Sequence, residues 1–226
     1  TKDFFSKKKI LVTGHTGFKG SWLTLWLMMQ GASVYGYALP PKKNQPLFNE
    51  FFYKQKSSRY ITGKLEHNIG DINDFDKLSD YVSKVKPDLI FHLAAQPLVQ
   101  TSYELPIETW NTNVIGSLNL LESLRGLQNE CAAVFITTDK VYKNKEWFFG
   151  YRENDELGGE DPYSSSKAAM ELAIKSWRSS FCGNLPHQNS RISIATARAG
   201  NVIGGGDWAE NRIIPDVINS LKDNKP

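Results

Sequence analysis

The stretch KILVTGHTGFKGSWL, residues 9–23, decides the fold of this chain. Its first part, Lys9–Thr13, is a short, mainly apolar run that ends at Gly14, which predicts a strand. The segment Phe18–Gln30 contains no helix breaker other than one glycine and stops at Gly31, which predicts a buried helix. A strand that leads directly into a helix is the first unit of a parallel α/β sheet.

The turn between the two elements carries three glycines, Gly14, Gly17 and Gly20, in the pattern GxxGxxG. The first permits a tight turn, the second lets a pyrophosphate approach the backbone, and the third lets the helix pack close to the strand. Free N–H groups at the start of the helix then face the phosphates. Together with its flanking strand and helix, the pattern predicts a dinucleotide-binding site.

The alternation of strands and helices continues along the chain. Further strands are expected at residues 33–39, just before Asp71, and at residues 89–93, 133–136 and 192–197. Further helices are expected at residues 74–86, 107–127 and 164–180. Because the strands lack polar alternation and are followed by helices, they predict a Rossmann-type, doubly wound parallel sheet covered on both faces. Trp22 and Trp26, at helical spacing, are expected in the core.

The bulk properties favour a globular protein of one domain or slightly more. The chain has 226 residues, of which 40% are hydrophobic and 23% charged, and its net charge of +3 gives no reason to expect a nucleic-acid partner. The most apolar run, Trp22–Met29, is too short to span a membrane, and no signal peptide is recognised. Cys131 and Cys182 lack metal-ligand spacing, so we expect no metal site, reduced packing cysteines and a cytoplasmic location.

One part of the dinucleotide signature is absent. An acidic residue that holds the adenine ribose normally follows the second strand, but this sequence has Gly36-Tyr37-Ala38-Leu39 there. Lys42 and Lys43 lie further along and are most simply loop charges. The residues by themselves therefore leave NAD and NADP both open, while Asp71-Ile72 either caps the following helix or contacts the adenine.

A second pattern points to redox chemistry. Tyr163 and Lys167 are four residues apart in a segment that opens a helix, so both side chains lie on one helical face. A lysine ammonium beside a phenol favours the phenolate, which suits the phenol for proton transfer. Thr138, at the end of an intervening strand, completes a constellation that is much more specific than YxxxK alone.

These motifs, in their order along the chain, resemble those of the extended short-chain dehydrogenases/reductases, the NAD-dependent epimerases and dehydratases that modify nucleotide sugars. Within that family, several longer stretches are similar to the CDP-glucose 4,6-dehydratases. They are TGHTGFKGSWL, GYALPP, TTDKVY, GYRENDELGGEDPYSSSKAAMEL and ARAGNVIGGGDWAENRIIPD.

The resemblance implies tightly held NAD and a sugar-nucleotide substrate, and it assigns residues to each role. The implied cofactor-binding residues are Gly14, His15, Gly17, Phe18, Lys19, Gly20, Asp71, Ile72, Leu93, Ala94, Ala95, Gln96, Asn113, Tyr163 and Lys167. The implied substrate-binding residues are Gln96, Thr138, Asn201 and Arg212, and the implied catalytic residues are Thr138, Asp139, Lys140, Tyr163 and Lys167.

The implied reaction has three stages. Tyr163, helped by Lys167 and Thr138, takes the proton from the sugar 4-hydroxyl while a hydride leaves C4 for NAD. Lys140 then removes the C5 proton while Asp139 protonates the departing 6-hydroxyl, and the hydride returns to C6. A basic lysine must be neutral for part of this cycle and an acidic aspartate protonated, although their mutual attraction favours the charged forms. Desolvation by substrate and proton exchange within the pair are both consistent with the sequence.

The resemblance also implies a longer protein. Residues 1–200 are expected to form the NAD-binding Rossmann domain, and residues 201–226 the start of a C-terminal substrate lobe that is largely missing. A homodimer or dimer of dimers is expected through the helices at 107–127 and 164–180. The implied biological role is the synthesis of deoxysugars for surface polysaccharides such as the O-antigen of lipopolysaccharide.

Two other functions remain open at this level. A nucleotide-sugar 4-epimerase would need Tyr163 and Lys167 but has no need of Asp139-Lys140. A catalytically silent NAD-binding protein could regulate a partner through its redox state, although the intact tyrosine, lysine, threonine and acid argue against this.

Overall fold

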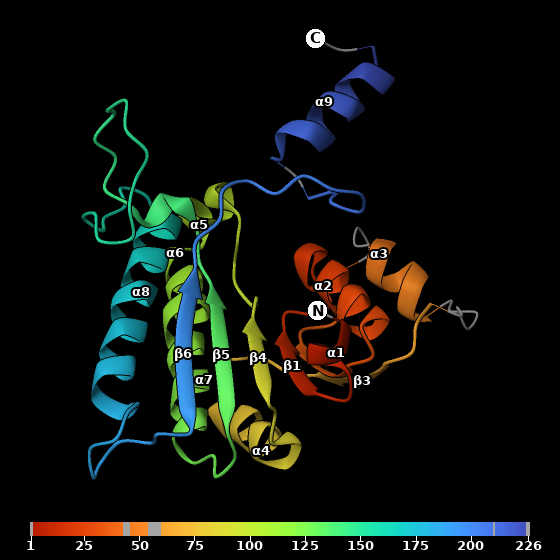
Figure 1. Ribbon diagram of the computed structural model, residues 1–226. Coiled ribbons are helices and arrows are strands. Elements are labelled where there is room, and N and C mark those ends of the chain that lie inside the picture. The colour runs from red at the N-terminus through yellow and green to blue at the C-terminus, as the bar shows by residue number, and fades with distance from the viewer. Residues whose placement is uncertain (1, 43–45, 54–59, 210, 225–226) are drawn as a thin grey trace.

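The computed structural model describes residues 2–42, 46–53, 60–209 and 211–224. Within these ranges, six strands form one parallel sheet in the order β3-β2-β1-β4-β5-β6 (Figure 1). The strands are β1 (Lys9–Thr13), β2 (Ser33–Ala38), β3 (Lys64–Ile69), β4 (Leu89–His92), β5 (Cys131–Ile136) and β6 (Ile192–Ala197). The prediction of a Rossmann-type α/β sheet is confirmed.

The longer helices are α2 (Phe18–Met29), α4 (Phe75–Val85), α7 (Gly116–Arg125), α8 (Pro162–Phe181) and α9 (Ile213–Lys222). Shorter ones are α1 (Lys2–Phe5), α3 (Pro46–Phe48), α5 (Val99–Glu104), α6 (Pro106–Trp110) and the 3₁₀ turn η3 (Asp139–Val141). Two π-helical segments, η1 (Asn49–Tyr53) and η2 (Asn111–Ile115), are also present. The single helix expected at 107–127 is therefore α6, η2 and α7 in succession.

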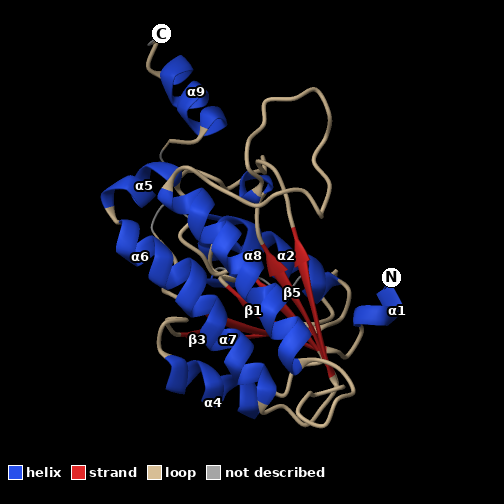
Figure 2. Ribbon diagram, turned by 90° about the vertical axis from the view of Figure 1, so that its left-hand side faces the viewer, coloured by secondary structure: helices blue, strands red, loops and turns tan. Residues whose placement is uncertain are grey.

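Two hydrophobic clusters hold the helices against the sheet. Side chains of α4, α7 and α8 pack on one face, where the largest fully buried ones include Leu78, Leu120, Leu121 and Met170. These helices lie together on that side of the molecule (Figure 2). On the opposite face, Leu27 and Met28 of α2 pack against Ile10 and Val12 of β1 and Val34 of β2.

Coverage of the second face is less complete than the strand composition predicts. Burial alternates along β6, where Ile192 and Ile194 are buried but Ser193 and Ala195 are exposed. Figure 1 shows no described helix in front of β5 and β6. The expectation that every strand is covered on both faces is therefore wrong for β6, because the helix that would cover this side is not among the described elements.

Two other expectations fail for local reasons. Trp22 and Trp26 are 44% and 42% exposed, because the buried face of α2 is formed by smaller and aliphatic side chains. Trp22 instead donates its Nε1 hydrogen to the carbonyl oxygen of Gly205 at 2.9 Å. Asp71 does not cap α4: Asp74 does, by accepting from the N–H of Lys77.

Candidate active site

The carboxyl ends of the strands bring the predicted site residues to one edge of the sheet. The glycine turn follows β1, residues 93–96 follow β4, Thr138 follows β5 and Asn201 follows β6. The strand order reverses between β1 and β4, and this switch point is where doubly wound sheets bind their ligands.

The glycine turn has the geometry that the sequence predicts. Gly14 has φ +72°, and a Cβ there would lie 2.7 Å from the backbone nitrogen of Ala94. A Cβ on Gly20 would lie 2.1 Å from the carbonyl oxygen of Gly14, so no larger residue fits without a backbone shift. Gly17 is the N-cap of α2 and offers no side-chain cap, which leaves backbone N–H groups of the first turn available to an anion.

His15, in the same turn, is turned inward. It is fully buried, its Nε2 lies 2.5 Å from Nδ1 of His67, and its ring fills the space above Gly36. Burial, with a smaller contribution from His67, lowers the pKa of His15 to about 3, so the ring is neutral. Lys19, by contrast, is an exposed residue, but partial desolvation of its ammonium group and the charge of Arg212 lower its pKa.

A chain of buried polar groups that the sequence reasoning missed runs beneath the turn. His92 Nδ1 lies 2.7 Å from Thr13 Oγ1, and His92 Nε2 lies 3.0 Å from Ser117 Oγ, which donates to the carbonyl oxygen of Asn113. Since Ser117 uses its hydrogen in this way, His92 donates from Nε2 and accepts at Nδ1. Burial lowers the pKa of His92 to about 3, which keeps this arrangement neutral. The sequence feature that could have indicated this chain of polar groups is a histidine inside an otherwise apolar strand.

Asn113 connects this chain to the predicted site. It is fully buried in η2, accepts from the N–H of Gln96 at 2.9 Å and donates to the carbonyl oxygen of Gln96 and to Ser166 Oγ. Asn113 is therefore a buried residue that connects two elements and not an asparagine on the helix surface. The side chain of Gln96 is itself engaged by Leu98 and Thr109, so it braces the loop after β4.

Helix α8 places Tyr163 and Lys167. Asp161 caps the helix by accepting from the N–H of Ser164 at 2.9 Å, and Pro162 occupies the first turn. The two side chains are 9% and 3% exposed. Among the described residues, the hydrogen-bond acceptors near Lys167 Nζ are the carbonyl oxygen of Ile136 at 3.5 Å and Met170 Sδ at 3.6 Å.

The environment strongly affects the ionisation of both groups. Burial, together with the charge of Lys19, lowers the pKa of Lys167 to about 7, although Glu171 opposes the change. Burial raises the pKa of Tyr163, while a hydrogen bond with Thr138 and the charge of Arg212 act against the increase. Arg212 therefore contributes positive charge near the phenol, which the sequence spacing did not indicate.

Asp139 and Lys140 lie in η3 at the end of β5. Lys140 Nζ is 3.3 Å from Asp139 Oδ1 and 3.1 Å from Asn201 Oδ1, and Thr138 donates to Asp139 Oδ1 at 3.1 Å. The side chains of Lys140 and Asp139 are 41% and 55% exposed. The pair is therefore a solvated ion pair that lies within the site and contacts the predicted substrate residue Asn201.

Arg212 lies at the N-terminus of α9. Its Nε is buried without a hydrogen-bond partner among the described residues and lies 3.9 Å from Asp207 Oδ2. Charges on Lys19 and Arg212 act on each other and on the groups of α8. A buried guanidinium nitrogen that makes no hydrogen bond to the described residues, near a lysine and an uncapped helix N-terminus, is an environment suited to phosphate groups.

The two predicted residues after β3 have different surroundings. Asp71 is exposed and accepts from the N–H of Asn73 at 2.9 Å. Ile72 is 3% exposed and packs against Gly116, so its side chain belongs to the core. Lys43, interpreted above as a loop charge, lies outside the described residues.

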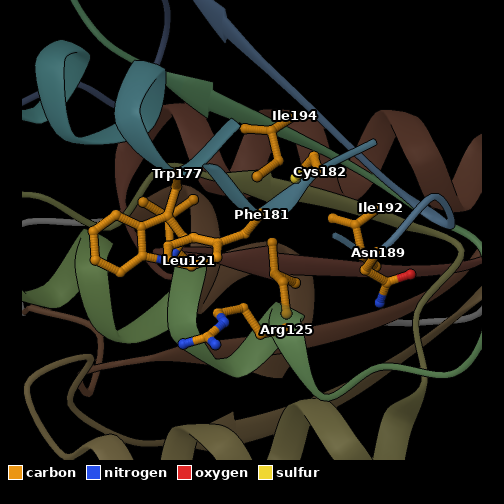
Figure 3. Close-up of a pocket in the computed structure, with 9 residues that line it drawn as sticks. Leu121, Arg125, Trp177, Phe181, Cys182, Asn189, Ile192 and Ile194 are labelled. Atoms are coloured by element: carbon orange, nitrogen blue, oxygen red, sulfur yellow. The ribbon is translucent and has the colours of Figure 1, made fainter. Parts of the chain in front are cut away.

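Away from this edge, an apolar pocket lies between α7, α8 and the start of β6 (Figure 3). It is lined by Leu121, Leu124, Arg125, Trp177, Phe181, Cys182, Asn189, Ile192 and Ile194. Arg125 lies over the ring of Phe181 at 4.3 Å. Since Ile192 begins β6, this pocket is at the end of the sheet opposite the catalytic candidates.

Within the described part of the chain, no group of three or more potential ligands could hold a metal ion. None of the described helices is long and apolar enough to cross a bilayer. Cys131 and Cys182 are both free thiols.

The parallel sheet with a glycine turn at its switch point defines a dinucleotide-binding α/β protein, and Tyr163 with Lys167 adds the redox motif. The family model described as GDP-mannose 4,6 dehydratase matches residues 11–196. The chain belongs to this family of NAD-dependent sugar-nucleotide epimerases and dehydratases.

One curated relative agrees with this assignment, and two solved structures share the fold. CDP-glucose 4,6-dehydratase of Salmonella typhimurium is 48% identical over 224 residues, which are 99% of this chain and 60% of that protein. An epimerase structure from Methanothermobacter thermautotrophicus matches with a TM-score of 0.77 and 24% identity, over all of this chain and 61% of its own. MoeE5, solved with UDP-glucose and NAD, matches with a TM-score of 0.74 and 24% identity, over 94% of this chain and 60% of its own. The chain thus spans about three fifths of the length of these relatives.

Proposed function

We propose that this protein is an NAD-dependent 4,6-dehydratase that converts CDP-glucose to CDP-4-keto-6-deoxyglucose. The observation that carries the proposal is the Asp139–Lys140 ion pair at the end of β5, beside Thr138 and within the same site as Tyr163. A 4-epimerase does not use an acid and a base at this place. The 48% identity to a CDP-glucose 4,6-dehydratase supports both the reaction and the cytidine nucleotide.

NAD is the proposed cofactor, and the described residues fit it. The glycine turn and the first turn of α2 would bind the pyrophosphate, and the sparsely partnered ammonium of Lys167 would bind hydroxyl groups of the nicotinamide ribose. When bound, NAD accepts the hydride from C4 of the sugar and returns it at C6. His15 and Ile72 have buried side chains and would contribute the shape of the site rather than hydrogen bonds.

The chain's own residues would move the protons. Tyr163 takes the proton of the 4-hydroxyl as the C4–H bond is broken, assisted by Thr138 and by the positive charge of Arg212. Within the ion pair, Lys140 first passes a proton to Asp139 when bound substrate desolvates both groups, which gives a neutral base and a protonated acid. Lys140 then removes the C5 proton, which the 4-ketone has made acidic, and Asp139 protonates the 6-hydroxyl so that it leaves as water. Lys140 returns the proton to C5, and the proton that Tyr163 took up passes to Lys140 to restore the starting state. One water is lost, and sugar oxidation at C4 is balanced by reduction at C6.

The same site would hold the substrate. Arg212 and Lys19 offer positive charge to a diphosphate, and Asn201 offers an amide beside Lys140. Residues 1–200 would then be the cofactor domain, and residues 201–226 would begin the substrate-binding lobe. The largely exposed apolar residues of α9, including Ile213 and Leu221, are consistent with packing against such a lobe.

A homodimer is also proposed. Ile107, Ile115 and Leu172 are 72%, 46% and 57% exposed on the neighbouring helical segments α6, η2 and α8. Apolar side chains at these positions would pack against their counterparts in a second copy. The cytoplasmic location and the role in surface polysaccharide synthesis stay predictions.

A direct test is to incubate the purified protein and NAD with CDP-glucose, dTDP-glucose, UDP-glucose or GDP-glucose, and to follow products by mass and NMR. The proposal expects a product lighter by one water, with a 4-ketone and a 6-methyl group, chiefly from CDP-glucose. Formation of CDP-galactose alone would instead establish the epimerase. Absence of both bound nucleotide and turnover would favour the silent NAD-binding protein.

Lys140→Met tests the assignment of the C5 base. This variant should retain oxidation at C4, seen as bound reduced nicotinamide, while product formation falls by about 100-fold or more because C5 deprotonation is lost. Lys143→Met is the matched control, because Lys143 is exposed and pairs with Glu156 outside the site. Normal product formation by Lys140→Met would show that Lys140 is not the base.

A further inference from the structure

Glu171 is a buried carboxylate that the proposed proton transfers do not use. It lies one helical turn after Lys167 on α8 and is 5% exposed. Arg198 binds it with two hydrogen bonds, from Nε to Oε1 at 3.1 Å and from Nη2 to Oε2 at 3.0 Å. Thr137 donates to Oε1 at 2.6 Å and Thr196 donates to Oε2 at 3.1 Å. One carboxylate thus joins α8 to the carboxyl ends of β5 and β6.

Both members of this ion pair are charged. Burial by itself would raise the pKa of Glu171, but the hydrogen bonds from Arg198 and Thr137 outweigh it, and the pKa lies below its usual value. The pKa of Arg198 is raised by its hydrogen bonds to Glu171. A two-pronged guanidinium–carboxylate contact in a buried place has a fixed orientation, unlike an exposed ion pair.

Residues 138–141, which include Asp139 and Lys140, form the acid–base segment. Arg198 also contacts the residue that follows this segment. Arg198 lies over the ring of Tyr142 at 4.9 Å, and its Nη1 donates to the carbonyl oxygen of Glu153 at 3.1 Å. Tyr142 in turn stacks on Tyr151 at 4.9 Å. The ion pair therefore contacts Thr137 before the segment and Tyr142 after it.

Other contacts also hold the segment between these two residues, including a hydrogen bond from the N–H of Gly158 to the carbonyl oxygen of Val141 at 2.8 Å and direct packing of η3 against α8. The N–H of Asp139 donates to the carbonyl oxygen of Ala199 at 3.0 Å, and Val141 is fully buried. The side chains of Asp139 and Lys140 themselves are exposed and contact Asn201 and Thr138. Their position relative to α8 is thus set by these contacts together with the contacts that Thr137 and Tyr142 make with the Glu171–Arg198 ion pair.

We propose that Glu171 and Arg198 are positioning residues that hold Asp139 and Lys140 in register with Tyr163. The inference rests on the proposed dehydratase function, which requires these groups to act on C4, C5 and C6 of one bound sugar. Tyr163 is carried by α8 and the acid–base pair by the end of β5, so the two sets act on one sugar only if helix and strand are fixed together. A displacement of about 1 Å in such a site lowers the rate by about 100-fold.

Thr137 and Thr196 provide a matched pair of variants, because each donates one hydrogen bond to Glu171 but only Thr137 adjoins the acid–base segment. Thr137→Val should lower kcat for CDP-glucose by at least about 10-fold with KM changed less than about 2-fold. Reduced nicotinamide should accumulate, since C4 oxidation continues while loss of water is slowed. Thr196→Val should stay within about 2-fold of the wild type, and Thr137→Ser, which keeps the hydroxyl, should restore kcat.

Hydrogen exchange of the amides of residues 138–142 gives a second readout that needs no turnover. Exchange should be faster in Thr137→Val than in the wild type and unchanged in Thr196→Val. Equal effects of the two valine variants on kcat and on exchange would overturn the proposal. If the wild type forms no 4-keto-6-deoxy product, the dehydratase function fails instead, and the exchange comparison still decides whether Glu171 and Arg198 fix the segment.

Discussion

Replacing Lys167 with methionine should make the protein more stable while inactivating it. Lys167 is 3% exposed, and in the described part of the chain its ammonium meets hydrogen-bond acceptors only at 3.5 Å and 3.6 Å. Folding lowers its pKa from 10.5 to about 7. At about 1.4 kcal/mol per pH unit, burying the charged form costs up to about 5 kcal/mol, and about 4 kcal/mol at pH 7, where about half is charged. Methionine has a similar shape and no charge.

The sign of the pH dependence follows from the lowered pKa. Between pH 7 and 10.5 the unfolded chain holds the lysine proton more often than the folded protein, so the wild type becomes more stable as the pH rises. The methionine variant lacks this contribution. Its advantage should therefore be constant well below pH 7 and should shrink by about 2 kcal/mol between pH 7 and pH 9.

Urea unfolding at several pH values without nucleotide measures the difference. Lys175→Met is the control, since Lys175 is exposed on the same helix and its replacement should change stability by less than about 0.5 kcal/mol at every pH. The reasoning would be refuted if Lys167→Met were less stable than the wild type at pH 7. It would also be refuted if the difference in unfolding free energy between the two proteins did not depend on pH. A stability gain with loss of turnover would show that the site retains a destabilising cation for its function.

Two further outcomes are expected. Gly20→Ala should destabilise the protein by about 1–3 kcal/mol and abolish dinucleotide binding, because its Cβ would lie 2.1 Å from the Gly14 carbonyl oxygen. Thermal unfolding measures the loss of stability, and NAD titration measures the loss of binding. Gly126→Ala, whose Cβ would meet nothing within 4 Å, is the control and should be neutral or slightly stabilising. Leu172→Asp should convert a dimer to monomers in light scattering, whereas Leu185→Asp, at a similarly exposed position outside the helical surface, should leave the mass unchanged. A wild-type protein that is monomeric at all concentrations would contradict the proposed interface.

The sequence by itself determined the sheet and the glycine turn. Mainly apolar runs five or six residues long, such as Lys9–Thr13 and Ile192–Ala197, favour strands of a parallel sheet, and their bounds match the structure. The spacing of the glycines also predicted the turn correctly. Only glycine fits at Gly14 and Gly20, because a Cβ at either position would clash with nearby backbone atoms. Local chemistry sufficed in both cases.

Only the tertiary structure decided which side chains contact one another and how their surroundings change their ionisation. Asn113 and His92 looked like separate polar residues, and Trp22 looked like core, because periodicity does not show which groups meet across strands and helices. The pKa of Lys167 depends on burial and on Lys19, which lies far away in sequence. The clearest case is Glu171: it joins α8 to residues of β5 and to Arg198 beyond β6, so its role emerges only when folding brings the ends of parallel strands together.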